Sequence, residues 1–221
     1  MNRVFVSWSG GKDCSLAAYR AITAGMKVSY LANTVSADGQ RSCSHGIAAR
    51  LIRLQSQAMD IPLFQQPTEP NDYEAKFKEM VRSMKKEGIT GGVFGDIDFS
   101  PHREWIERVC AEAGVTPHLP LWEESQEKLL KEFIRLGFQA VVVATRADIL
   151  GEEWLGRRVD ADFVRDLKAK GVTPCGEAGE YHTLVVDGPL FRQRLEIGQT
   201  SKVRRDNHCF LEISDISLRT K

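Results

Sequence analysis

The sequence predicts an α/β protein, with a parallel sheet flanked by helices and a smaller α+β domain after it. Three observations support this fold class. Short β-rich runs alternate with helical segments up to Leu121, a glycine-rich turn joins the first run to the first helix, and β-rich segments dominate the chain after Gly171. Strands that alternate with helices of about 10 to 15 residues form βαβ units, whose strands are parallel.

Apolar residues at helical spacing mark each expected helix of the first half. In the first helix they are Cys14, Ala17, Ala18 and Ala21, and Gly25 is a suitable stop. The expected strands span residues 4–6, 28–35, 61–64 and 92–95, with a short extended piece at 117–121. The later helices carry Ile47, Leu51, Leu54 and Ala58, then Tyr73, Phe77, Met80 and Met84, then Trp105, Ile106, Val109 and Cys110.

The second half of the chain has a different order of helical and β-rich segments. A helix with Leu129, Leu130, Phe133 and Ile134 on its apolar face precedes an expected strand at 140–144, and another helix is expected at 162–170. Further β-rich segments lie at 181–187, 195–197 and 209–216. We therefore expect two domains, at residues 1–121 and 122–221.

Composition excludes several classes of protein. Thirty basic and thirty acidic residues cancel, so we expect no direct binding of nucleic acid and no membrane partner. No apolar run approaches the roughly 18 residues that a membrane span needs, and the N-terminus enters a strand pattern without a signal peptide. The five cysteines are scattered without a C-x-x-C pair, which indicates a reduced, cytoplasmic protein. The oligomeric state is open, a homodimer included.

Residues Ser9-Gly10-Gly11-Lys12-Asp13 have the composition of a phosphate-binding loop. Glycine lets the backbone turn tightly, and the first turn of a helix offers unpaired N–H groups and a partial positive charge. Together these features make an anion site. Asp96 follows another expected strand, and parallel strands end at one edge of a sheet, so we expect Asp96 to face the same crevice as Ser9.

Two other known types of phosphate-binding loop do not match this sequence. The Walker A pattern needs Gly where Val6 stands and Ser or Thr where Asp13 stands, and the pattern G-x-G-x-x-G is absent from the sequence. The loop SGGKD resembles instead the pyrophosphate loop of the N-type ATP pyrophosphatases, which adenylate a substrate and release pyrophosphate. Those proteins usually have Ser where this chain has Cys14, and Ser15 is the alternative hydroxyl donor.

A second stretch, rich in glycine and ionisable residues, lies near the other end of the chain. It reads CGEAGEYHT at residues 175–183 and is followed by DGPLF at 187–191. Glu177 and Glu180 can bind an ammonium ion, Mg²⁺ or a cationic substrate, and His182 can act as an acid or base near neutral pH. The alternative is a glycine-rich turn with both glutamates in solvent.

Motifs along nearly the whole chain resemble the diphthine–ammonia ligase family. They are SGGKD near the start, GDI at 95–97, PLW at 120–122, LGR at 155–157, and GEAGEYHT with DGPLF. The resemblance implies an ATP-binding domain of the adenine nucleotide alpha-hydrolase type and a family-specific second domain. It also implies that ATP, ammonia and a carboxylate give an amide, AMP and pyrophosphate, and the best-known acceptor is diphthine on translation elongation factor 2.

The expected roles follow from the loop and from this resemblance. The nucleotide would contact Ser9, Gly10, Gly11, Lys12, Asp13, Cys14, Ser15, Asn33, Thr34, Gly95 and Asp96. Lys12 would neutralise the β,γ-phosphates, and Asp13 would either hold Mg²⁺ or cap the helix. The acceptor or ammonium would contact Arg103, Gly176, Glu177, Glu180, Tyr181 and His182. We expect catalysis from Lys12, Asp13, Glu177, Glu180 and His182.

Two other functions compete with this one. A sulfur-transferring pyrophosphatase acting on RNA would carry a persulfide on Cys43 or Cys175, although the missing cysteine pair and the neutral charge disfavour it. A nucleotide sensor without enzymatic activity would bind ATP on the same loop and release no pyrophosphate.

Overall fold

The structure, a computed structural model, describes residues 2–221. It divides into two compact units, Met1–Ser9 with Asp13–Glu123, and Gly10–Lys12 with Glu124–Lys221.

The first unit contains a parallel five-stranded sheet with the strand order β3-β2-β1-β4-β5. Its strands are β1 (Arg3–Ser7), β2 (Lys27–Ser36), β3 (Leu63–Thr68), β4 (Gly91–Val93) and β5 (Thr116–His118). The helices of this half of the chain are α1 (Lys12–Thr23), α2 (Ala49–Met59), α3 (Tyr73–Lys86) and α4 (Ser100–Ala113). The predicted α/β class is therefore confirmed, and Gly25 follows α1 with a positive φ of 85°, as a helix stop requires.

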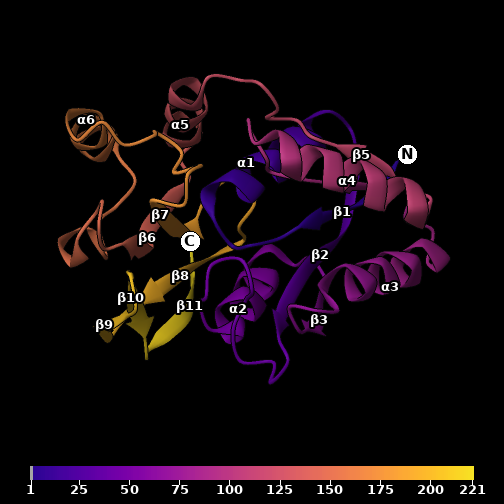
Figure 1. Cartoon of the computed structure of the whole chain (residues 1–221), viewed down its shortest axis with the longest axis horizontal. Coiled ribbons are helices and arrows are strands. Elements are labelled where there is room, and N and C mark those ends of the chain that lie inside the picture. Colours follow the sequence, from indigo (N-terminus) through magenta and orange to yellow (C-terminus); the bar gives the residue numbers. More distant parts are fainter. Residues whose placement is uncertain (1) are drawn as a thin grey trace. The chain divides into compact units, whose positions relative to one another are not determined.

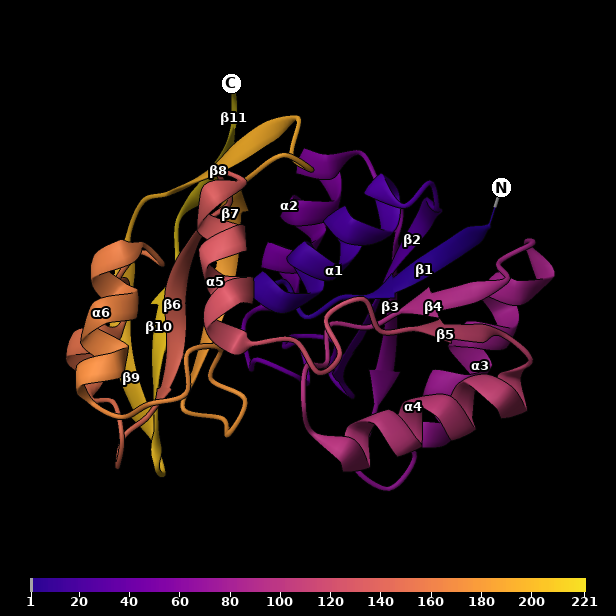
Figure 2. The same cartoon turned by 90° about the horizontal axis from the view of Figure 1, so that it is seen from above.

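Helices cover both faces of this sheet. Figure 2 shows α3 and α4 together on one face and α1 and α2 on the other. Right-handed βαβ crossovers produce this arrangement, because the chain moves outward from β1 to β3 and then returns to β4 on the other side of β1.

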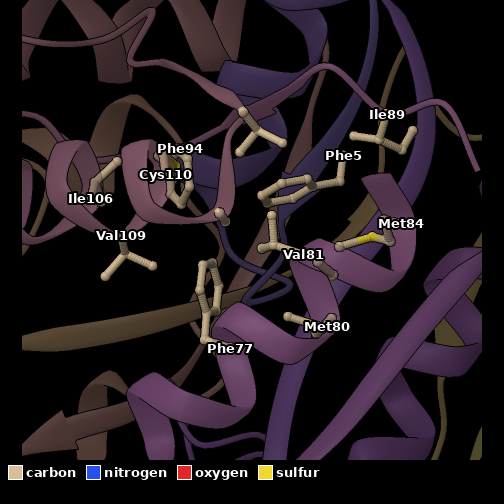
Figure 3. Close-up of a cluster of buried hydrophobic side chains, with 13 residues drawn as sticks. Phe5, Phe77, Met80, Val81, Met84, Ile89, Phe94, Ile106, Val109 and Cys110 are labelled. Carbon is tan, nitrogen blue, oxygen red and sulfur yellow. The ribbon is translucent and has the colours of Figure 1, made fainter. Parts of the chain in front are cut away.

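The core beneath α3 and α4 is built from aromatic and aliphatic side chains (Figure 3). Phe5 of β1 lies edge-on to Phe77 of α3 and to Phe94, with ring centroids 6.3 and 5.9 Å apart. The helical spacing of Phe77, Met80 and Met84 brings all three into this cluster, where each is buried. The hydrophobic spacing in the sequence thus corresponds to the buried face of α3.

The second unit contains two antiparallel sheets. The larger has the order β7-β6-β10-β9, and the smaller pairs β11 with β8. The strands are β6 (Gln139–Arg146), β7 (Tyr181–Asp187), β8 (Gln193–Ile197), β9 (Thr200–Arg205), β10 (His208–Ile213) and β11 (Ile216–Thr220). Helices α5 (Gln126–Arg135) and α6 (Ala161–Ala169) lie together on one side of the larger sheet in Figures 1 and 2, and a 3₁₀ turn spans Glu152–Trp154.

Some expected elements differ from those observed. Helix α2 begins at Ala49, so Ile47 lies before it, and β3 begins two residues later than expected and continues to Thr68. The expected segment 209–216 is two strands, β10 and β11, because the chain turns at Ser214, whose N–H donates to Gln199 O. Among residues 2–221, no helix has both the length and the apolar character of a membrane span.

Candidate active site

The strand order reverses at β1, which lies between β2 and β4. Because β1 and β4 are parallel neighbours, their carboxyl ends lie side by side, where open α/β sheets bind ligands. Gly95, just after β4, lies against the start of α1: a Cβ at this position would be 2.8 Å from the backbone carbon of Asp13 and 2.8 Å from the nitrogen of Cys14. Only glycine allows this approach, so the structure brings the segment after β4 to the first turn of α1.

The loop turns at Gly10, whose φ of 84° is strained for any residue with a Cβ. Ser9 Oγ lies 3.4 Å from Cys14 Sγ, to which it donates, and both Cys14 and Ser15 are buried. Helix α1 begins at Lys12, so Asp13 lies inside its first turn instead of at the cap position. The Asp13 carboxylate is thus near the positive end of the helix dipole.

Asn33 and Thr34 of β2 are buried. The amide nitrogen of Asn33 donates to the carbonyl oxygen of Trp8 and to Ser42 Oγ, both at 2.9 Å. Asn33 therefore holds the backbone where β1 leaves the sheet and approaches the loop. Burial raises the pKa of the Tyr73 phenol, and Thr34 opposes that shift.

Trp8 and Gln55 were not among the residues predicted for the site. The indole nitrogen of Trp8 donates to Gln55 Oε1 at 2.8 Å, and both side chains are buried. This pair fixes the residue that precedes Ser9. A signal was present, because Gln55 is a polar residue within the apolar stripe of α2, three residues after Ile52 and four after Leu51.

Asp96 and Arg103 have partners within the first unit. Nδ1 of His102 donates to Asp96 Oδ1 at 3.1 Å. Arg103 donates to Glu107 Oε1 at 2.7 Å, and its guanidinium carbon lies 5.0 Å from the centre of the Trp122 ring. The expected substrate-binding residue Arg103 thus takes part in a surface ion pair in this structure.

Lys12 makes its contacts in the second unit, with only 4% of its surface exposed. Its Nζ donates to the carbonyl oxygen of Cys175 and lies 5.0 Å from the centre of the Tyr181 ring. Its backbone N–H donates to Thr183 Oγ1 at 3.1 Å. Val185 N–H, on the outer edge of β7, donates to Gly10 O at 2.9 Å. Within the second unit, Gly10 and Lys12 therefore contact the segment 175–185.

Glu180 stabilises the turn between α6 and β7. It is 4% exposed, and its Oε1 accepts hydrogen bonds from the hydroxyl of Thr173 at 2.8 Å and from the Thr173 N–H at 3.3 Å. Its Oε2 accepts from the Ala178 N–H at 2.9 Å. These bonds satisfy the buried carboxylate, so Glu180 shapes the turn that presents Glu177, which is partly exposed.

Tyr181 is buried and locked in place. Its hydroxyl donates to Pro174 O at 2.5 Å, and its ring lies edge-on to Phe163 at 5.2 Å. Gly176 packs on this ring with a φ of 72°. The Tyr181 ring therefore makes a cation–π contact with the Lys12 ammonium. Gly176 is required for this arrangement, because a side chain at that position would collide with the ring.

His182 lies on β7, near Lys12 and His208. Burial, together with the nearby Lys12 and His208, lowers the pKa of His182 from 6.5 to about 4. The imidazole is therefore neutral at physiological pH, and a neighbouring ammonium opposes its protonation.

Neither a metal cluster nor a disulfide marks the site. Within residues 2–221, no group of three or more His, Cys, Asp or Glu side chains is arranged to hold a metal ion. The five cysteines all lie in this described part of the chain, and none forms a disulfide. Cys175, an expected persulfide carrier, is buried and its thiol donates to Gln126 O at 3.4 Å.

Comparison with known proteins gives consistent matches along the chain. The sequence profile described as "Diphthamide synthase N-terminal domain" matches residues 2–117, and that described as "Diphthamide synthase C-terminal domain" matches residues 125–218. The chain is 27% identical to the diphthine--ammonia ligase of Bos taurus over 237 residues, covering 96% of this chain and 89% of that protein. It is 28% identical to that of Danio rerio over 230 residues, covering 93% and 90%.

One solved structure, described as a predicted subunit of tRNA methyltransferase from Methanocaldococcus jannaschii, shares 15% sequence identity with the chain. Its TM-score is 0.46, with coverage of 86% of this chain and 98% of that one, a likeness too weak to bear on function.

Proposed function

Because the chain belongs to the diphthamide synthase family, we propose that it is an ATP-dependent ligase that couples ammonia to a carboxylate, with diphthine on translation elongation factor 2 as the acceptor. The observation that carries this proposal is the loop Ser9–Asp13 at the reversal of strand order, with Gly95 packed against the first turn of α1. Its backbone and its cation suit the triphosphate of ATP.

The reaction needs activation of the carboxylate, because a carboxylate oxygen is a poor leaving group. An oxygen of the acceptor carboxylate attacks the α-phosphorus of ATP, the bond to the β,γ-phosphates breaks, and an acyl adenylate and pyrophosphate form. Ammonia then attacks the acyl carbon, AMP leaves, and one proton is released. In this scheme the amides of the loop and Lys12 hold the departing pyrophosphate, and most of the acceleration comes from positioning and charge stabilisation.

Asp13 is the residue of the loop that would hold Mg²⁺. A magnesium ion usually keeps several waters and binds through one or two carboxylates plus the substrate phosphates, so a dedicated cluster of protein ligands is not needed. The Asp13 carboxylate, in the first turn of α1, would hold such an ion, and the ion would neutralise part of the charge of the phosphates.

The second unit supplies the groups nearest to Lys12. We assign Glu180 and Tyr181 to positioning, since their polar atoms are used within the turn 173–181. Glu177, presented by that turn, would contact ammonium or the acceptor. His182 would contribute a neutral imidazole, because its pKa is lowered to about 4.

Family membership favours the ligase over the two competing functions. Of the two cysteines that could carry a persulfide for sulfur transfer on RNA, Cys175 is buried and Cys43 is exposed, so Cys43 is the accessible candidate. Full activity after replacement of both Cys43 and Cys175 by Ser would dismiss that function. A sensor would bind ATP and release no pyrophosphate. A reducing compartment, the cytoplasm, suits a chain whose described cysteines form no disulfide.

The proposal is tested by incubating the full chain with ATP, Mg²⁺, ammonium and elongation factor 2 that carries diphthine. We expect AMP and pyrophosphate in equal amounts, and an amide in place of the diphthine carboxylate by mass spectrometry. Omitting either ammonium or the acceptor should abolish amide formation. Formation of ADP and phosphate, or an acceptor that stays unmodified while ATP is bound, would refute the proposed reaction.

A further inference from the structure

His102 is hydrogen-bonded to a carboxylate, an arrangement that is typical of histidines that act as general bases. Its Nδ1 donates to Asp96 Oδ1 at 3.1 Å, and the His102 side chain is 65% exposed while that of Asp96 is 23% exposed. Because a carboxylate accepts the Nδ1 hydrogen, the basic lone pair of the neutral ring lies on Nε2. A carboxylate in this position orients the ring and stabilises the imidazolium that forms when Nε2 takes a proton.

The ring of His102 is also held from a second side. The ring of Phe99 meets it edge-on, with the planes at 90° and the centroids 4.7 Å apart. Phe99 itself is 48% exposed, so this ring contact lies at the surface. The Asp96 hydrogen bond and the Phe99 ring contact both restrain the orientation of the His102 imidazole.

The pair lies at the edge of the sheet where the nucleotide loop lies. Asp96 follows Gly95, whose backbone touches that of Asp13 and Cys14 at the start of α1. Asp96 also acts electrostatically on the Tyr73 phenol, whose pKa is influenced as well by Thr34, near the end of β2. His102 is on the first turn of α4. All these residues belong to the first unit.

We propose that His102 is the general base of the amide-forming step, with Nε2 taking the proton from the attacking nitrogen, and that Asp96 positions and polarises it. This inference rests on the proposed ligase function. In the step, the nitrogen of ammonia bonds to the acyl carbon, His102 Nε2 removes one proton from that nitrogen, and the bond between the acyl carbon and the AMP oxygen breaks. The imidazolium then returns its proton to water, so the balance is acyl adenylate plus ammonia to amide, AMP and one proton.

The other histidine near the loop is less suited to this role. His182 is surrounded by Lys12 and His208, and the lowered pKa of its imidazole makes it a weak base. A proton placed on His182 would be repelled by the Lys12 ammonium, whereas a proton on His102 would be attracted by the Asp96 carboxylate.

Separate measurement of the two half-reactions distinguishes this role of His102 from a general loss of structure. Carboxylate-dependent exchange of labelled pyrophosphate into ATP measures adenylation, and amide formation measures both steps. With diphthine-bearing elongation factor 2 as the acceptor, we expect His102→Ala to retain the exchange within about threefold and to lose amide formation by about 10²- to 10⁴-fold. Added imidazole should restore part of the amide formation, because the side chain that it replaces is exposed.

Asp96→Asn should reduce kcat for amide formation by at least about tenfold with little change in the KM for ammonium, since the ring remains but loses its charged partner. Imidazole should not restore Asp96→Asn. The matched control is Glu104→Gln, an exposed residue on the same turn of α4, which should behave as wild type.

Each contrary outcome has a distinct meaning. Undiminished amide formation by His102→Ala, or equal loss of exchange and amide formation without rescue by imidazole, would overturn the role of His102. A wild-type protein that catalyses neither half-reaction would instead overturn the proposed function on which the inference rests.

Discussion

The ammonium group of Lys12 donates a hydrogen bond to the carbonyl oxygen of Cys175, although the two residues are 163 positions apart in the sequence. The same ammonium lies over the Tyr181 ring, and the Lys12 N–H donates to Thr183. The two densest motifs of the sequence, the loop 9–13 and the segment 175–183, are therefore parts of one group of contacts. Any change at Lys12 acts on both.

Replacement of Lys12 by Met should weaken ATP binding by about 10- to 100-fold while AMP binding changes little. A hydrogen bond to a charged group contributes about 1.5–3 kcal/mol, and AMP lacks the phosphates that Lys12 is proposed to hold. Calorimetric titration of both nucleotides measures the difference, with the exposed Lys128→Met as the control. An equal loss of affinity for ATP and AMP would mean that Lys12 acts only through its contacts with Cys175 and Tyr181.

The Glu180 carboxylate should contribute to stability through Thr173. Glu180→Gln places an amide where two N–H donors and a hydroxyl now converge on a carboxylate, and we expect a loss of about 2–3 kcal/mol in the free energy of unfolding. Thr173→Val removes the hydroxyl donor with little change in shape. Because the two side chains are hydrogen-bonded to each other, urea unfolding of the double variant should show less than the sum of the single losses. Strict additivity would contradict the assigned contact.

Much of the first unit could be predicted from the sequence because its buried residues follow the period of the element that carries them. Phe77, Met80 and Met84 illustrate this, since their helical spacing coincides with the buried face of α3. Strand β9 had no such signal: Lys202, Arg204 and Arg205 are exposed, so no apolar face marks the strand. The order of the strands depends on pairing between distant segments, which local patterns do not contain.

The candidate site is only partly marked by local patterns in the sequence. The glycines and Lys12 of the loop carry a local signal, and so does the strand before them. The sequence could not decide between solvent, ligand and structural roles for Glu180, because the answer depends on where the N–H groups of Thr173 and Ala178 point. The pairing of Asp96 with His102 is likewise a property of the folded loop after β4.

Gly176→Ala should destabilise the protein more than Gly179→Ala. Both glycines have a positive φ, 72° and 77°, so each alanine carries a similar backbone penalty of about 1–2 kcal/mol. At Gly176 the new Cβ would also lie 2.9 Å from the ring of Tyr181, which is buried, whereas nothing lies within 4 Å at Gly179. We expect a difference of about 1–2 kcal/mol between the two variants in urea unfolding. Equal losses would show that the Tyr181 ring yields to the methyl group.

His182 should make the protein less stable as the pH falls. The pKa of its imidazole is about 4 in the folded chain and 6.5 in the ordinary case, so between these values the unfolded state binds more protons than the folded state. Stability therefore rises with pH across this window, and the contribution of His182 is complete above pH 6.5 and is lost as the pH falls towards 4.

Comparison with His182→Gln isolates this contribution from that of the carboxylates, which also titrate in acid. Urea unfolding of both proteins at pH 7.5 and pH 5 should show that the wild type loses about 2 kcal/mol more than the variant on acidification. When the same comparison is made in proteins that carry Lys12→Met, the difference between the protein with His182 and its His182→Gln variant should be smaller. Removing the ammonium removes one of the causes that keep the imidazole neutral. If wild type and His182→Gln lose the same free energy of unfolding on acidification, the pKa of His182 is the same in the folded and unfolded states. That result would contradict the buried environment described for His182.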